Sequence, residues 1–485
     1  MPDLRTSVPS NGSASATADR IDQAFEAQQA HAPAVRRTDA RQRKAKIRRL
    51  REAVYDRRDA IRHAMKQDFR RPEPEVDLTE VKAVGDEATF ALRHLDDWMA
   101  TERVPTPSLL LGTRSEIRYQ PKGVVLIISP WNYPFNLTLG PLVAALAAGN
   151  CVIIKPSEYT PHSSAVMREM IEDLYDEREV ALIEGDATVA QHLLEKPFDH
   201  IYFTGSPQVG SIVMQAAAKQ HASVTLELGG KSPTIVDETA DLEDAAAKIA
   251  WGKFTNCGQT CIAPDFVLAH DRIADDLVNH LRNAIARAYG DTPEKRRSTP
   301  DYARIVNDKH FQRVNRLLTA AVEDGATVAA GGQVDAEDRY IAPTVLTEVP
   351  DETALMEEEI FGPILPVLPY RSIDTVLSDL RSRPNPLALY LFTESAAMEE
   401  RILNETSAGG TAINDVLLHY MNPHLPFGGA GTSGIGQGHG IHAFREFSRM
   451  RSVLRRSVGS AFMRQAYPPY TRVTRKLVDW ILKFF

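Results

Sequence analysis

Two of the three cysteines in this 485-residue chain lie close together, at positions 257 and 261 of the segment FTNCGQTC that spans residues 254–261. A cysteine sulfur is a soft nucleophile that is suited to attack a carbonyl carbon. A free cysteine has a pKa near ~8.5 and is mostly protonated at neutral pH, and most cysteines are buried structural residues. The segment alone therefore offers Cys257 and Cys261 as candidate nucleophiles, with a structural role as the more common alternative.

A carboxylate, Glu227, lies upstream of these cysteines in a second segment of small residues. It follows a strand-like run at 223–226 and precedes the glycine pair Gly229-Gly230. The carboxyl end of a strand, beside backbone that a ligand can approach closely, is a typical position for an active site. Glu227 could there activate a water molecule that cleaves a covalent intermediate. An ion pair with a nearby basic residue is the more common role of such a carboxylate.

An asparagine, Asn132, lies in the segment 129–135 that joins a buried apolar run to the next helical pattern. Its side-chain amide could donate a hydrogen bond to an oxyanion, a contribution of roughly 3–4 kcal/mol where it has been measured in other enzymes. The alternative is a turn asparagine whose aromatic neighbours pack in the core.

Two further segments are candidates for binding a nucleotide cofactor. Lys155 and Glu158 follow an apolar run and could bind ribose hydroxyls, or could lie in an exposed loop. The segment from Gly205 to Gly210 reads as a strand, a glycine turn and a helix start, which can present backbone N–H groups to a pyrophosphate. It lacks the middle glycine of Gly-x-Gly-x-x-Gly and is a weak signal alone. The 14 histidines are scattered, so we predict no metal site.

The pattern of apolar runs predicts an α/β fold. Short β-branched runs of this kind are typical of strands that are buried on both faces of a parallel sheet. They alternate with helical segments, which indicates a doubly wound sheet with ligands at the carboxyl ends of its strands. The alternation resumes after residue 230, which predicts a second α/β domain at about 230–420. The first four expected strands are 124–128, 151–154, 180–183 and 201–203.

Composition restricts the partners of the protein. The net charge is −8 and the pI is near 6.0, which argues against nucleic acid as the main partner. No apolar run reaches the ~18–20 residues that span a bilayer, and residues 1–19 lack the apolar stretch of a secretory signal. The small number of cysteines and the lack of a secretory signal predict a cytoplasmic protein. The apolar end at 476–485 predicts a final helix docked on the body, with contact to a membrane surface as the alternative.

Six motifs of this chain occur together and in one order. The set resembles the NAD(P)-dependent aldehyde dehydrogenase superfamily over nearly the whole chain from about residue 20. Trp131-Asn132-Tyr133-Pro134 and the segments 261–265 and 424–429 are similar to the class 3 branch, which includes fatty-aldehyde and coniferyl-aldehyde dehydrogenases. The six motifs are PWN at 130–132, KPSE at 155–158, FTGS at 203–206, LELGGK at 226–231, GQTC at 258–261 and EIFGP at 359–363.

The resemblance implies a reaction and a role for each matching residue. Cys261 would attack an aldehyde, Asn132 would hold the oxyanion, and Glu227 would activate the water that hydrolyses the thioester to a carboxylic acid. Hydride would pass to NAD, with NADP also accepted and NAD preferred because the Glu158 carboxylate should repel a 2′-phosphate. The residues implied to bind the cofactor are Lys155, Glu158, Gly205, Ser206, Val209, Gly210, Glu359 and Phe361.

The resemblance also implies the domain organisation and the oligomeric state. We expect a flexible tail at 1–19, a Rossmann-like cofactor domain at 20–106 and 121–229, and a catalytic domain at 230–426. A bridging arm with a C-terminal extension would take 107–120 and 427–485, and its contact with a second copy would give a homodimer.

Several alternatives stay open at this stage. If the helix before Cys257 continued, Cys257 and Cys261 would lie on the same helical face, and chemistry alone would not choose between them. CoA-acylating relatives use the cysteine but typically lack the glutamate that is present here as Glu227. A non-enzymatic protein on the same scaffold and a thiol hydrolase are further alternatives.

Overall fold

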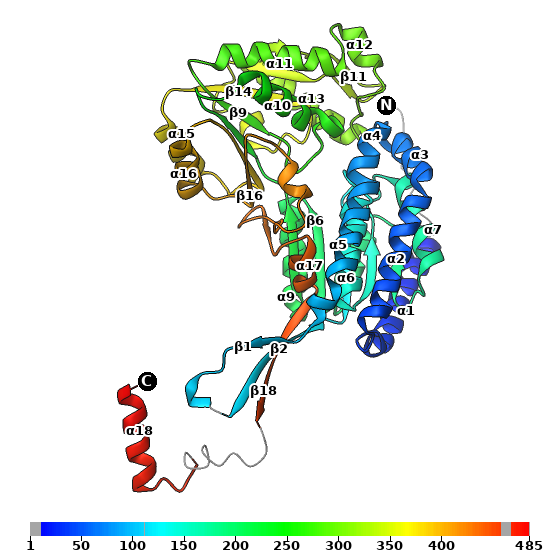
Figure 1. The fold of residues 1–485 in the computed structure, drawn as a ribbon. Helices are drawn as coiled ribbons and strands as arrows, with labels where there is room; N and C mark the ends of the chain where they lie inside the picture. Colours follow the sequence, from blue (N-terminus) through cyan, green and yellow to red (C-terminus); the bar gives the residue numbers. More distant parts are fainter. Residues whose placement is uncertain (1–10, 111, 457–466, 485) are drawn as a thin grey trace.

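The structure is a computed structural model that describes residues 11–110, 112–456 and 467–484. Within these ranges the chain forms a six-stranded sheet, a seven-stranded sheet and a three-stranded sheet, here called the first sheet, the second sheet and the arm sheet. Figure 1 shows the arm sheet extending away from the body that contains the other two sheets.

The first sheet has the order β17-β7-β6-β3-β4-β5 and is parallel except for β17, which runs antiparallel to β7. The chain runs outward from β3 through β4 to β5 and then returns to β6 and β7 on the other side of β3. The carboxyl ends of β3 and β6 therefore flank the switch point where doubly wound sheets bind ligands. The strands are β3 (Val124–Ile128), β4 (Cys151–Lys155), β5 (Val180–Leu182), β6 (His200–Gly205), β7 (Ser223–Leu228) and β17 (Gly434–Ile435).

Helices cover both faces of the first sheet, and this explains why its apolar runs are continuous. Alternate residues of β3, β4, β5 and β6 enter one of two apolar cores, as Val125 and Leu126 of β3 do. One core also contains side chains of α2 (Ala40–Asp56), α3 (Arg58–Phe69), α5 (Lys82–Met99), α6 (Asn136–Ala148) and α7 (Pro161–Leu174). The other contains side chains of α1 (Asn11–Val35), α8 (Ala187–Leu194) and α9 (Pro207–Gln220).

The second sheet has the order β10-β13-β14-β9-β8-β15-β16 and is parallel except for the edge strand β10. It confirms the predicted second α/β region. Its strands are β8 (Pro233–Val236), β9 (Phe266–His270), β10 (Thr327–Ala330), β13 (Thr344–Thr347), β14 (Ile364–Tyr370), β15 (Ala388–Phe392) and β16 (Gly410–Ile413). Its main helices are α10 (Leu242–Phe254), α11 (Ala274–Tyr289), α13 (Asp308–Glu323), α15 (Ile373–Ser382) and α16 (Ala396–Glu405).

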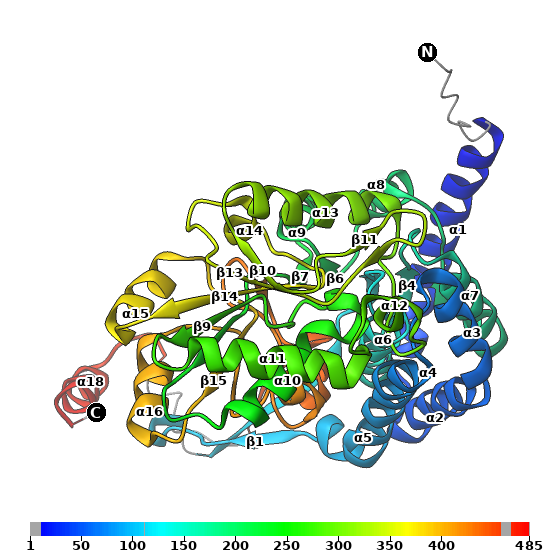
Figure 2. The same ribbon diagram turned by 90° about the horizontal axis from the view of Figure 1, so that it is seen from above.

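Local sequence signals that mark the helix ends agree with the structure. Gly149 follows α6 with φ 87°, the left-handed conformation that glycine adopts without strain. Asp241 precedes α10, and its carboxylate accepts hydrogen bonds from the backbone N–H groups of Glu243 and Asp244. Figure 2 shows α2, α3 and α7 together on one side of the molecule and α15 and α16 on the opposite side.

The arm sheet corrects two boundaries of the expected arm. It consists of β1 (Glu102–Val104), β2 (Thr113–Pro121) and β18 (Ser448–Arg456), so the arm begins before residue 107. Residues 427–447 do not belong to it, because β17 pairs with β7 of the first sheet and α17 (Gly440–Glu446) packs on α5 and α6. The expectation failed there because strand pairing between distant segments leaves no local signal in a glycine-rich stretch.

Both chain ends also differ from expectation. Helix α1 begins at Asn11, so residues 11–19 are helical and not a tail, which is consistent with the high helix propensity of their alanines; Met1–Ser10 lie outside the described residues. The predicted docking of the C-terminal helix on the body is wrong. Helix α18 (Arg472–Phe484) lies apart from the body in Figure 1, and Val473 and Leu482 are largely exposed.

Candidate active site

The two cysteines of the 254–261 segment are separated by an abrupt change of chain direction. Helix α10 ends at Phe254, and Asn256, Cys257 and Gly258 then adopt left-handed backbone conformations with φ of 52°, 55° and 74°. A Cβ atom on Gly258 would lie 2.3 Å from the Gly362 carbonyl oxygen, so no larger residue fits there. This left-handed turn (residues 256–258) ends the helical spacing that would have placed both sulfurs on one face.

The left-handed turn gives the two thiols different surroundings. Cys257 is 1% exposed, and its Sγ contacts the Tyr302 hydroxyl at 3.4 Å inside the apolar core. Cys261 is partly exposed and lines two cavities. Burial raises the pKa of the Cys261 thiol to about 12, and the charges of Glu359 and Glu227 act in the same direction.

Glu227 lies near the carboxyl end of β7 and is 5% exposed. Neither of its carboxylate oxygens accepts a hydrogen bond from another described residue. Burial raises the pKa of Glu227 well above its usual value, the charge of Glu446 adds to this shift, and the nearby Tyr202 hydroxyl acts against it. An unsatisfied buried carboxylate destabilises the folded protein, and its raised pKa makes it a stronger base than an exposed glutamate.

Asn132 follows β3 in the loop that leads to α6, and it is 3% exposed. Its side-chain Nδ2 donates a hydrogen bond to the Gln259 carbonyl at 3.1 Å. A second contact joins the same two loops, since the Tyr133 hydroxyl lies 2.7 Å from the Thr260 hydroxyl. An amide nitrogen carries two hydrogens, so Asn132 keeps one donor for a ligand beside Cys261.

Two cavities meet at the candidate catalytic residues. One has a volume of about 470 Å³ and the other about 1320 Å³. Cys261 and Glu227 line both cavities, together with Thr204 and Leu228 of the first sheet. A molecule in the smaller cavity and a molecule in the larger cavity would therefore face the same sulfur and the same carboxylate.

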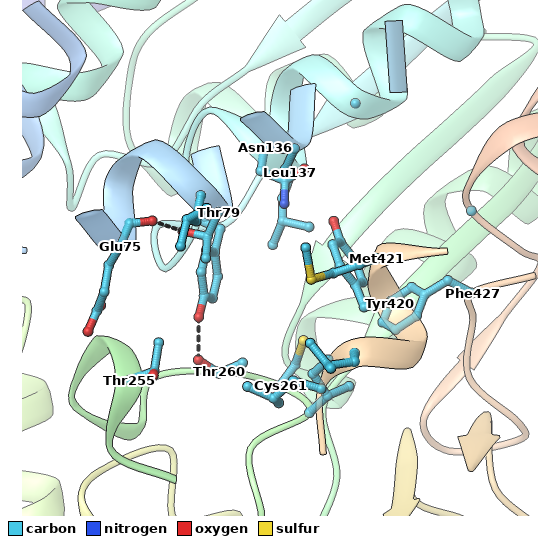
Figure 3. Close-up of a pocket in the computed structure, with 18 of the residues that line it drawn as sticks. Glu75, Thr79, Asn136, Leu137, Thr255, Thr260, Cys261, Tyr420, Met421 and Phe427 are labelled. Atoms are coloured by element: carbon cyan, nitrogen blue, oxygen red, sulfur yellow. Dashed lines mark hydrogen bonds between the residues drawn. The ribbon is translucent and has the colours of Figure 1, made fainter. Parts of the chain in front are cut away.

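The smaller cavity, here called the apolar cavity, is lined mainly by hydrophobic and aromatic side chains. Figure 3 shows Cys261 at one wall of it, with Tyr420, Met421 and Phe427 close by. Leu418 and Met421 belong to a short 3₁₀ helix at Leu418–Met421 and are 42% and 56% exposed, so the wall continues to the surface as an apolar rim. Pockets of this kind hold apolar ligands and orient them with a few polar groups.

The larger cavity, here called the cofactor cavity, passes the start of α9 and the glycine pair after β7. Gly205 and Ser206 line it, and Ser206 caps α9 by accepting a hydrogen bond from the Val209 backbone N–H. The positive end of the α9 dipole and free N–H groups favour a pyrophosphate at this position. Gly210 packs against the first sheet, since a Cβ atom there would lie 2.7 Å from Leu228 Cδ2.

The remaining residues predicted to bind the cofactor divide into two groups. Glu359 and Phe361 line the cofactor cavity. Glu359 lies against Gly229, where a Cβ atom would be 2.1 Å from its Oε2, and burial raises the pKa of Glu359 to about 8. Lys155, Glu158, Val209 and Gly210 are not among the residues that line this cavity. Lys155 Nζ instead pairs with a Glu158 carboxylate oxygen at 2.7 Å beyond the end of β4.

Two parts of the site were missed by sequence reasoning. The 3₁₀ helix at Leu418–Met421 contributes apolar wall but carries no motif. Arg71, Glu75 and Glu80 lie beneath the Asn132 loop, in a segment of alternating proline and glutamate that gives no signal of its position. Among the described residues, no group of three or more His, Cys, Asp or Glu side chains is placed to hold a metal ion.

Comparison with known proteins agrees with this geometry. Residues 6–453 match the model of the "Aldehyde dehydrogenase family". The chain is 44% identical over 428 residues to human "Aldehyde dehydrogenase family 3 member B1", covering 88% of this chain and 90% of the relative. A structure of "Staphylococcus Aureus AldH" in a substrate-bound state superposes with a TM-score of 0.90 at 41% identity, over 95% of this chain and 99% of that chain. The "NAD+ complex structure of aldehyde dehydrogenase from bacillus cereus" has a TM-score of 0.82 at 28% identity, over 90% and 89%.

These likenesses extend over both sheets and include the segments that line the two cavities. The chain therefore belongs to the aldehyde dehydrogenase family, in its class 3-like branch, and is an NAD(P)-dependent enzyme that oxidises aldehydes to carboxylic acids.

Proposed function

We propose that Cys261 is the nucleophile of this enzyme and Glu227 its general base. The observation that carries the proposal is that both side chains line both cavities, so that they face an aldehyde from one side and a cofactor from the other. The core position of Cys257 supports the choice of Cys261, because an aldehyde in either cavity has no access to a thiol that is 1% exposed.

In the first stage the Cys261 sulfur forms a bond to the aldehyde carbon, and the thiol proton passes to bulk solvent. The carbonyl oxygen becomes an oxyanion, which accepts hydrogen bonds from the free N–H of the Asn132 amide and from the Cys261 backbone N–H. A nicotinamide cofactor, when bound, supplies the hydride acceptor that makes this adduct a thioester. Asn132 is 3% exposed, and electrostatic interactions are stronger in such low-dielectric surroundings than in water.

In the second stage a water molecule hydrolyses the thioester. Glu227 takes a proton from that water as the oxygen attacks the thioester carbon, and the Cys261 thiolate leaves. Its missing hydrogen-bond partners and its raised pKa both support this role, since the carboxylate is free to accept a proton. The presence of Glu227 also favours acid release over transfer of the acyl group to CoA.

We propose that the larger cavity binds the cofactor through Gly205, Ser206, Glu359 and Phe361, which line it. Lys155 at the end of β4 and Glu158 after it would bind the adenosine ribose. Gly205 and Ser206 at the start of α9 would hold the pyrophosphate, and Glu359 would accept hydrogen bonds from the nicotinamide ribose. Phe361 would pack beside the nicotinamide, and its ring already contacts Trp131 with centroids 5.4 Å apart. Val209 and Gly210 would act through the backbone of the first turn of α9.

Replacing Glu227 with Gln separates the two stages. We expect rapid release of about one NADH per active site to persist, while steady-state turnover falls by about 10²- to 10⁴-fold, the usual contribution of a general base. The wild-type kcat should fall as pH drops through the raised pKa of Glu227, because only the carboxylate accepts the proton, and the variant should lack this limb. Stopped-flow absorbance at several pH values measures both effects.

The control for this experiment is Glu116→Gln, which neutralises a buried carboxylate of the arm sheet, 7% exposed and paired with Arg455. It should retain both the rapid phase and the steady state. The role proposed for Glu227 would be contradicted if Glu227→Gln turned over at the wild-type rate. It would also be contradicted if the variant lost the rapid phase together with steady-state turnover.

We propose that the substrates are aldehydes with long apolar chains. The apolar walls of the smaller cavity support this, as does the exposed rim formed by Leu78, Trp251, Leu418 and Met421. A small polar aldehyde would leave most of this surface in contact with water.

A series of straight-chain aldehydes tests the substrate class. Each methylene that enters the cavity gains about 0.8 kcal/mol, so kcat/KM should rise by about fourfold per carbon until the cavity is filled. Leu418→Asp at the rim should lower kcat/KM for long aldehydes and leave kcat/KM for short aldehydes unchanged. A flat or falling series from propanal to decanal would refute an apolar substrate.

We propose that NAD is preferred over NADP, because the Glu158 carboxylate would lie near the ribose. Glu158→Gln should raise kcat/KM with NADP by about fivefold, since a partly exposed charge contributes up to about 1 kcal/mol. Glu179→Gln, at the opposite end of the first sheet, should change neither cofactor's kcat/KM. A wild-type enzyme that uses NADP at least as well as NAD refutes the preference.

We propose a homodimer that forms through the arm sheet. The edge strand β18 carries Met450 and Leu454, which are 70% and 56% exposed, and such an edge readily pairs with a second chain. Membrane contact through α18 and a cytoplasmic location stay predictions. Among the described residues, no helix is long and apolar enough to cross a bilayer.

Sedimentation measures the oligomeric state directly. The wild-type chain should sediment as about twice its 53.8 kDa mass, and Leu454→Asp should shift it towards the monomer by placing a charge at the shared edge. Val328→Asp places the same charge on a partly exposed apolar residue of the second sheet, 39% exposed, and this variant should remain a dimer. Monomeric wild-type protein at micromolar concentration would refute the dimer.

A further inference from the structure

A closed ring of four residues, of which Arg71, Asn132 and Asn256 are buried and Glu75 is partly exposed, joins the Asn132 loop to the left-handed turn. Arg71 Nη1 donates to the Asn132 carbonyl at 3.3 Å, and the Asn256 Nδ2 donates to the same oxygen at 3.0 Å. The Asn256 backbone N–H donates to Glu75 Oε2 at 3.0 Å, and that oxygen pairs with Arg71 Nε at 3.5 Å. Each member therefore contacts the next, and the ring connects three segments that are far apart in sequence.

The two terminal nitrogens of the Arg71 guanidinium make further contacts, whereas its Nε donates no hydrogen bond. Its side chain is 0% exposed, and it donates to Glu80 Oε1 at 2.7 Å and to the Thr79 hydroxyl at 2.7 Å. Its centre lies 4.2 Å from the centroid of the Tyr133 ring. The arginine guanidinium is planar and always charged, and its five N–H donors can reach several partners at once. A lysine ammonium at this position would reach only some of these partners.

The partners of Arg71 reach the adjoining elements as well. Glu80 Oε2 accepts a hydrogen bond from the Asn136 backbone N–H at 2.8 Å, which fixes the start of α6 just after the Asn132 loop. The Asn256 Nδ2 also donates to the Gln259 carbonyl at 3.1 Å, the oxygen to which the Asn132 amide donates. Asn132 is thus held at its backbone by Arg71 and Asn256 and at its side chain by Gln259.

We propose that Arg71, acting with Glu75 and Asn256, is a positioning residue that holds the Asn132 amide in the direction of the oxyanion. This inference rests on the role proposed above for Asn132. Neither Arg71 nor Asn256 lines the apolar or the cofactor cavity, so both act through Asn132 and not on the substrate. Misplacing a catalytic group by about 1 Å costs about 10²-fold in rate, which sets the size of the expected effect.

A double-mutant cycle between Arg71→Lys and Asn132→Ala tests the proposal. Arg71→Lys should slow the rapid phase of NADH release by about 10- to 100-fold. It should leave the affinity for NAD, measured by quenching of tryptophan fluorescence, within about twofold of wild type. Asn132→Ala should slow the same phase, and the double variant should be no slower than Asn132→Ala alone, because coupled residues act non-additively.

The matched control is Arg43→Lys. Arg43 is also a buried arginine of the helical layer, 5% exposed, and it donates to the carbonyls of Ala147 and Ala148 at the far end of α6. It should leave the rapid phase unchanged.

A second variant covers the case in which Arg71→Lys does not fold. Asn256→Gly keeps the left-handed backbone, which glycine adopts without strain, and removes both side-chain hydrogen bonds. It should slow the rapid phase of NADH release as Arg71→Lys does. Its effect should also be non-additive with the effect of Asn132→Ala. Additive effects, or wild-type rapid phases in the folded variants, would overturn the proposal. An unchanged rapid phase in Asn132→Ala would instead refute the oxyanion role of Asn132.

Discussion

The left-handed turn at residues 256–258 is the constraint on which the active site depends. Non-glycine residues in this conformation cost about 1–3 kcal/mol each and persist only where the surroundings hold them. Here Glu75 binds the Asn256 backbone N–H, and the Gly362 backbone lies where a side chain on Gly258 would be. The turn puts Cys257 in the core and brings Cys261 to the junction of the two cavities. A helix that continued past Phe254 would have placed both sulfurs on one face.

Burial provides the chemistry once the turn has placed the groups. The Cys261 thiol and the Glu227 carboxylate both have raised pKa values, mainly because the protein has removed water from them. Burial without hydrogen-bond partners, as at Glu227, destabilises the folded protein. Burial is the main cause of the raised pKa of the Cys261 thiol, and the charges of Glu359 and Glu227 act in the same direction. The site therefore contains buried ionisable groups in unfavourable surroundings as well as strained backbone conformations.

Much of this arrangement was predictable from the sequence, for identifiable reasons. Strands such as Val124–Ile128 and helix ends such as Gly149 depend on local patterns, and the motifs containing Asn132, Glu227 and Cys261 occur in a specific order. Three features were not predictable in this way. The pairing of β17 with β7 joins residues more than 200 positions apart, the Arg71 ring joins three distant segments, and the position of the C-terminal helix apart from the body depends on its tertiary surroundings. Each of these depends on long-range geometry, which has no local signature.

Chemical mapping of the acyl-enzyme tests the central claim most directly. Glu227→Gln enzyme would be mixed with NAD and an aldehyde, quenched in acid, digested and analysed by mass spectrometry, with a Cys257→Ser background as control. The account predicts one acyl group on the peptide that contains Cys261, in both the parent and the control background. An acyl group on Cys257, or its loss in the Cys257→Ser background, would contradict it.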